Sequence, residues 1–203
     1  AAMQGGWAEY ARRGFYQLVL VAAIDLGFVL FCAVRGGRSK AEKALSLLVC
    51  ALTLVILASA FWRMRLYILA YGLSLLRVMT LWAMAFILLS LVLAAVKVLR
   101  PDFKFWPCFA ALGLYGWVLF NAANVDARIA DYNVDAYLDG RLSQVDTQYL
   151  ANLSPSALPA LERLYEAEPS GALKQSMASM RENAPESWIE WSLPLSKYSE
   201  PQG

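Results

Sequence analysis

Four long runs of hydrophobic residues occupy the first three fifths of the chain, and a mainly polar sequence follows them. The runs cover residues 15–34, 44–62, 78–96 and 105–121. A helix rises 1.5 Å per residue and needs about 20 apolar residues to cross the hydrocarbon core of a bilayer. The first three runs approach this length and the fourth is slightly shorter. The pattern therefore predicts four transmembrane helices within residues 1–122.

The segments between the runs contain residues that end helices. Glycines and basic residues fill positions 35–40, and Pro101 stops the third helix at the residue before it. The second helix is expected to continue beyond its apolar run to Ala70, where Tyr71 and Gly72 end it. Ser74 then offers a cap for the next helix.

The polar segment 123–203 shows helical spacing and no sustained strand alternation. Ser154-Pro155 and Ser170-Gly171 each have the form of a helix start, so three or four short helices are expected. Their apolar residues suit either a small core or a groove for a partner, and we favour the core: Leu150, Leu153, Leu158, Leu161, Leu164, Trp188 and Trp191. The predicted fold is an all-α membrane protein with four transmembrane helices followed by a small α-helical domain.

Composition supports the membrane assignment, because 59% of the residues are hydrophobic, 17% are charged and the mean hydropathy is +0.45. Charge divides the chain further. Residues 1–122 carry twelve Lys and Arg against four Asp and Glu, a balance of +8, whereas residues 123–203 carry six against twelve, a balance of −6. The two parts are expected to face different solvents. An acidic domain beside a basic, lipid-embedded part does not predict nucleic-acid binding.

The orientation follows mainly from the acidic segment. With the first and third loops placed inside, basic residues near the two membrane faces are almost equally divided, so the positive-inside rule decides little. Segments rich in Asp and Glu can be carried across the membrane, because the rule concerns Lys and Arg and acidic residues contribute little to it. We therefore place residues 123–203 on the extracytoplasmic side.

The chain lacks the residues of familiar catalytic sites. It contains no histidine, which removes the commonest general base and the usual zinc ligand. Its three cysteines, Cys32, Cys50 and Cys108, lie inside apolar runs without a CxxC spacing, as buried small hydrophobic residues do. The sequence therefore predicts a protein that is not an enzyme. It identifies no cofactor and leaves a bound pigment or quinone open.

Asp25 lies half-way along the first run, where an ionised carboxylate facing lipid would cost several kcal/mol. It is therefore expected to face protein, to carry a proton, or both. Thr53 and Ser90 lie at nearly the same depth in their own runs, so three helices are predicted to meet at a polar cluster. The cluster is either a proton or cation site or a hydrogen-bonded contact between helices, and the second interpretation is favoured.

Five arginines gather near the predicted outer membrane face: Arg12, Arg13, Arg63, Arg65 and Arg77. Guanidinium groups bind phosphate through paired hydrogen bonds, so these residues are candidate contacts for lipid headgroups or another anion. Arginines near helix ends more often anchor the helix in the headgroup layer.

Four acids, Asp126, Asp131, Asp135 and Asp139, recur every four or five residues after the last run. They are candidate ligands for a hard cation, but the dense pattern of a calcium loop is missing. A solvated helix face is favoured.

Four segments in order along the chain resemble a known family. They are Tyr-Ala-Arg-Arg-Gly-Phe at 10–15, the segment 63–77 with Tyr-Gly-Leu-Ser at its centre, Asn-Val-Asp-Ala-Arg-Ile-Ala-Asp-Tyr-Asn at 124–133, and Trp-Ile-Glu-Trp-Ser at 188–192. Together they resemble the bacterial membrane proteins catalogued as domain of unknown function 4173 or its relative 4153. The resemblance implies a bacterial inner-membrane or plasma-membrane protein, usually with further membrane helices upstream. It implies no particular chemistry.

Two functions remain as hypotheses. The first is a non-enzymatic subunit, scaffold or sensor of a bacterial membrane complex, with other membrane proteins as partners and Trp188 and Trp191 as candidate contacts. The second is a small transporter or a lipid- or anion-binding protein that uses Asp25 or the outer arginines.

Overall fold

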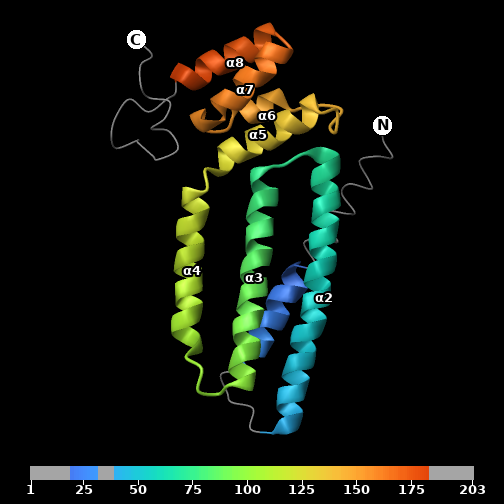
Figure 1. The fold of residues 1–203 in the computed structure, drawn as a ribbon, viewed down its shortest axis with the longest axis vertical. Coiled ribbons are helices and arrows are strands. Elements are labelled where there is room, and N and C mark those ends of the chain that lie inside the picture. The colour runs from blue at the N-terminus through green and yellow to red at the C-terminus, as the bar shows by residue number, and fades with distance from the viewer. Residues whose placement is uncertain (1–18, 32–38, 183–203) are drawn as a thin grey trace. The chain divides into compact units, whose positions relative to one another are not determined.

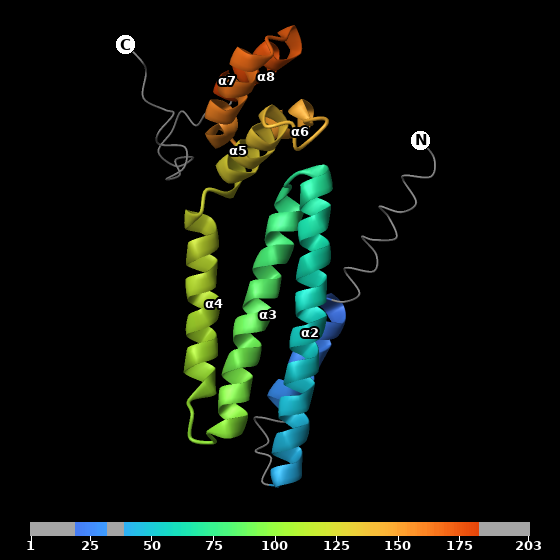
Figure 2. The ribbon, with the colours of Figure 1, turned by 45° about the vertical axis from the view of Figure 1, so that its right-hand side comes forward.

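The computed structural model describes residues 19–31 and 39–182, and every regular element in these two ranges is a helix. The Val19–Phe31 helix precedes three long ones, α2 (Lys40–Tyr71), α3 (Leu75–Leu99) and α4 (Phe105–Ala122). Shorter elements follow: α5 (Val125–Leu138), α6 (Thr147–Ala151), the 3₁₀ turn η1 (Pro155–Ala157), α7 (Leu158–Ala167) and α8 (Gly171–Glu182). Figures 1 and 2 show their order along the chain. The predicted all-helical architecture is confirmed for the described residues.

Among the described residues, three helices are long and apolar enough to cross a membrane, namely α2, α3 and α4. They contain the predicted runs 44–62, 78–96 and 105–121. With 32 residues, α2 is about 48 Å long, so it exceeds the ~30 Å hydrocarbon core. The predicted run 15–34 is described only over Val19–Phe31, and a fourth span there stays a prediction.

Local hydrogen bonds fix the ends of α2 and α3. Ser39 and Glu42 form a capping box at the start of α2: the Glu42 N–H donates to Ser39 Oγ at 3.1 Å, and the Ser39 N–H donates to Glu42 Oε2 at 3.4 Å. The pair satisfies N–H groups that a helix start leaves without partners. After α3, Lys97 Nζ donates to the carbonyls of Pro101 and Phe103 at 2.5 and 3.0 Å, which stabilises the turn toward α4.

The chain divides into two compact units. Among the described residues, unit 1 comprises 19–31, 39–67 and 79–116, and unit 2 comprises 68–78 and 117–182. The connection between α2 and α3 therefore belongs to the same unit as α5 to α8. The boundary between membrane and aqueous parts near residue 122 stays a prediction.

Within unit 1, buried positions of α2 and α3 recur every three or four residues, as an amphipathic packing stripe requires. On α2 they are Cys50, Thr53, Leu57, Ala60 and Met64, and on α3 they are Thr80, Met84, Ile87, Ser90, Leu91, Ala94 and Val98. On α4 the buried residue is Phe105. Phe105 stacks on Phe109 with ring centroids 5.4 Å apart, and Phe109 lies 5.7 Å from Phe86 of α3. Large apolar side chains elsewhere on α4 are exposed, as expected for a helix that faces lipid.

Unit 2 has a hydrophobic core of its own. Its buried members are Ile129, Ala130, Val134, Leu150, Ala157, Leu158, Ala160, Leu161, Leu164, Leu173, Met177 and Met180. Each fully buried leucine contributes about 1.5–3 kcal/mol relative to an exposed one. Of the leucines predicted to form this core, four are members and Leu153 packs against it partly buried, so the core interpretation is confirmed for them. Trp188 and Trp191 lie outside the described residues.

Candidate functional site

The connection between α2 and α3 is a tight turn built around Gly72. The Gly72 N–H donates to the Ile68 carbonyl at 2.8 Å, and the φ of Gly72 is +75°. This left-handed conformation is the usual end of a helix, and glycine adopts it without steric cost. Ser74 precedes α3, and its carbonyl accepts from the Val78 N–H at 3.0 Å. The predicted break at Tyr71-Gly72 is confirmed.

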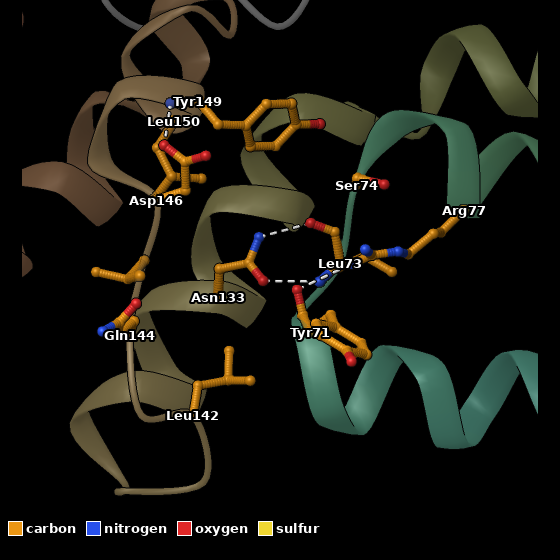
Figure 3. Close-up of a pocket in the computed structure, with 11 residues that line it drawn as sticks. Tyr71, Leu73, Ser74, Arg77, Asn133, Leu142, Gln144, Asp146, Tyr149 and Leu150 are labelled. Atoms are coloured by element: carbon orange, nitrogen blue, oxygen red, sulfur yellow. Dashed lines mark hydrogen bonds between the residues drawn. The ribbon is translucent and has the colours of Figure 1, made fainter. Parts of the chain in front are cut away.

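Asn133 of α5 binds the backbone of this turn with both ends of its side-chain amide. The Leu73 N–H donates to Asn133 Oδ1 at 2.7 Å, and Asn133 Nδ2 donates to the Leu73 carbonyl at 2.8 Å, as Figure 3 shows. Tyr149 adds a third bond, because its hydroxyl accepts from the Leu75 N–H at 2.9 Å. Helix ends and turns leave such backbone groups without partners. We call these three bonds the turn clamp.

Close approach also requires glycine at position 72. A Cβ atom there would lie 2.3 Å from Asn133 Oδ1 and 3.3 Å from Leu142 Cδ1. Asn133 is only 6% exposed, so its amide has little room to move away. The missing side chain of Gly72 therefore allows the clamp to form.

Arg77 lies beside the same turn. Its Nη1 donates to the Tyr71 carbonyl at 2.9 Å and to the Gly72 carbonyl. A cation at these last carbonyls of α2 also offsets the negative end of the helix dipole.

Of the other predicted anion contacts, Arg63 and Arg65 are exposed on α2, and Arg12 and Arg13 lie outside the described residues. An anion site formed by all five arginines stays a prediction.

A cavity of about 220 Å³ lies next to the clamp within unit 2. Buried Leu142 and Leu150 line it together with polar residues. Figure 3 shows the side chains that line it. They are Tyr71, Leu73, Ser74, Arg77, Asn133, Leu142, Gln144, Val145, Asp146, Tyr149 and Leu150.

In unit 1 the structure joins two of the three residues of the predicted polar cluster. Thr53 Oγ1 lies 3.1 Å from Asp25 Oδ2 and 2.9 Å from the Val49 carbonyl. A hydroxyl has one hydrogen, so these two acceptors share it. Ser90 is fully buried, and among the described residues its Oγ has no hydrogen-bond partner. A proton or cation role for the cluster stays a prediction.

The family profile with the description Domain of unknown function (DUF4153) matches residues 2–164, most of the 203-residue chain. The chain belongs to the DUF4153 family. No curated protein and no solved structure matches it.

The clamp of this DUF4153 protein joins two of the segments that carry the family resemblance. Leu73 belongs to the segment 63–77, and Asn133 is the last residue of the segment 124–133. Their side-chain and backbone groups bond across a separation of 60 residues. In this chain the two segments are therefore in contact, and their bonds hold α5 on the turn between α2 and α3.

The four acids at and after the start of α5 have partners inside unit 2. Asp126 Oδ2 accepts from the Ser154 N–H at 3.1 Å. Arg163 bridges Asp131 and Asp135 with two contacts of 2.6 Å, and Arg141 pairs with Asp139 at 2.8 Å. Within the described part of the chain, no group of three or more His, Cys, Asp or Glu is arranged to hold a metal. The acid spacing therefore serves ion pairs and a backbone contact.

A tyrosine near the end of α5 joins it to the end of α7. The Tyr137 hydroxyl lies 3.0 Å from each carboxylate oxygen of Glu168. This hydrogen bond, together with the Glu168 charge, raises the pKa of Tyr137. Sequence reasoning missed this contact and the turn clamp.

Proposed function

We propose that this protein is a non-enzymatic subunit or scaffold of a bacterial membrane complex, in which the helices of unit 2 present a surface to a partner. The observation that carries the proposal is the turn clamp. Within unit 2 it bonds α5 and α6 to the turn between two candidate membrane helices. A helical unit that includes such a turn suits the presentation of a surface beside a membrane. Family membership and the apolar helices support a membrane location.

The proposal is tested by crosslinking the tagged full chain in its native membranes, followed by purification and mass spectrometry. The informative variant is Asn133→Ala, which removes two bonds of the clamp. The matched control is Asn121→Ala, because the Asn121 amide bonds within its own helix, to the Trp117 carbonyl at 2.8 Å. We expect the wild type and the control to be recovered with one partner protein at a fixed molar ratio of partner to chain. For Asn133→Ala this ratio should be much lower when the amount of chain in the membranes is equal. A chain that is recovered alone, or a partner ratio that is unchanged by Asn133→Ala, would contradict the scaffold role.

We further propose that unit 2 lies on the extracytoplasmic side, as the −6 balance of residues 123–203 favours. The test is labelling of a cysteine at the exposed position Ser179 with a membrane-impermeant maleimide on intact cells. Ser179→Cys should be labelled, whereas Ala41→Cys, at the other end of α2 from the turn, should be protected. The reverse pattern would place unit 2 in the cytoplasm.

A further inference from the structure

The cavity beside the clamp carries one positive and one negative side chain. Among its lining residues these are Arg77, from α3, and Asp146, from the segment before α6. Figure 3 shows them on opposite sides of Asn133. A ligand with both charges would match this arrangement, whereas a simple anion would meet the carboxylate as well as the guanidinium.

Both charges are fixed by backbone groups. Arg77 Nη1 donates to carbonyls at the end of α2, and Asp146 Oδ1 accepts from the Tyr149 N–H at 2.8 Å. Side chains held in this way lose little further conformational freedom when a ligand binds. The cavity is therefore organised before a ligand arrives.

The cavity belongs to a turn between two helices that can cross a membrane. Such a turn lies at a bilayer surface, where lipid headgroups are found. Large apolar side chains beside it are exposed, with Leu69 at 49%, Leu75 at 41% and Leu76 at 59%. Acyl chains are the natural neighbours of such residues.

From these observations we propose that the cavity binds the zwitterionic headgroup of a phospholipid. Its phosphate lies beside Arg77 and its ammonium group beside Asp146. A volume of about 220 Å³ is smaller than the 300–1,000 Å³ typical of sites for larger ligands, and it suits a phosphate with a short aminoalkyl group. This proposal develops the lipid-binding alternative and does not depend on a protein partner.

The test uses the full chain in mild detergent with equal amounts of phosphatidylethanolamine and phosphatidylglycerol. The lipid retained after washing is quantified by mass spectrometry. We expect phosphatidylethanolamine to be enriched at least about tenfold, as one charge-assisted hydrogen bond to the ammonium group would provide. A retained mixture equal to the added one would overturn the proposal.

The decisive variant is Asp146→Asn, because asparagine caps a helix as well as aspartate does while removing the charge. It should abolish the enrichment. Asp139→Asn is the matched control, since Asp139 is an exposed acid of the same unit outside the cavity, and it should retain the enrichment. Equal enrichment in both variants would refute the role of Asp146. Binding of soluble phosphoethanolamine without retention of any lipid would refute the lipid as the ligand.

Discussion

Replacing Gly72 by alanine tests the turn clamp directly. The substitution carries two costs that the structure separates. The first is the backbone, because a non-glycine residue at φ +75° costs roughly 1 kcal/mol. The second is the clash of the new Cβ with Asn133 Oδ1 at 2.3 Å, well inside the 3.0 Å below which Cβ atoms are essentially never found. Asn133 must then move and break two bonds of the clamp.

The size of the second cost follows from the groups involved. Each of the two hydrogen bonds contributes about 1–1.5 kcal/mol. Gly72→Ala is therefore expected to destabilise unit 2 by about 3–4 kcal/mol. Gly140→Ala provides the matched control, since Gly140 has φ +71° and nothing within 4 Å of its Cβ position. It should cost only about 1 kcal/mol.

Hydrogen exchange with mass spectrometry gives the free energy of local opening for peptides covering residues 68–78 and 125–138. A double-mutant cycle strengthens the test. In an Asn133→Ala background the clash with the amide disappears, so Gly72→Ala should then cost about as much as Gly140→Ala, which corresponds to a coupling of about 2–3 kcal/mol. Equal effects of the two glycine substitutions in the wild-type background, or no coupling in the cycle, would show that the clamp contributes nothing.

Three further predictions concern other contacts. Because Glu168 raises the pKa of Tyr137 in the folded state, the hydrogen bond of Tyr137 should stabilise unit 2 below pH ~10, and this contribution should be lost as pH rises through the folded pKa. The difference in Tm between wild type and Tyr137→Phe should therefore shrink at high pH. A difference in Tm that stays constant with pH would contradict this prediction. If the contact between Asp25 and Thr53 is structural, Asp25→Asn should leave the Tm nearly unchanged, and Thr53→Val should lower the free energy of unfolding by about 1 kcal/mol. A large decrease in Tm with Asp25→Asn would exclude this interpretation. Arg163→Ala should cost no more than about 1–2 kcal/mol at low salt, since both of its ion pairs are about half exposed, and denaturation in 1 M salt should show a smaller effect.

Sequence reasoning located the helices because their causes are local. Runs of apolar residues identified α2, α3 and α4, and Gly72 and Pro101 marked the turns after α2 and α3. The leucine spacing in α7 likewise predicted the side of that helix that enters the core of unit 2.

The clamp was beyond such reasoning because its partners are distant in the sequence. A side-chain amide can bond to the backbone of any residue, so nothing in the spacing links Asn133 to Leu73 or Tyr149 to Leu75. The capping box of Ser39 and Glu42 did have a local signal, the Ser-x-x-Glu pattern, which was overlooked. The arginines were identified as a group by their predicted depth, yet depth alone did not reveal that Arg77 binds carbonyls of its own turn.

The long sequence separations in the clamp have a consequence for biosynthesis. The ribosome makes Leu73 first and reaches Asn133 60 residues later, which takes about 3–12 s at 5–20 residues per second. During that interval α4 is synthesised while the turn lacks the amide that will hold it. The nascent chain must therefore place its membrane hairpin before the partner of the turn exists, and a chain terminated ahead of Asn133 could never complete it.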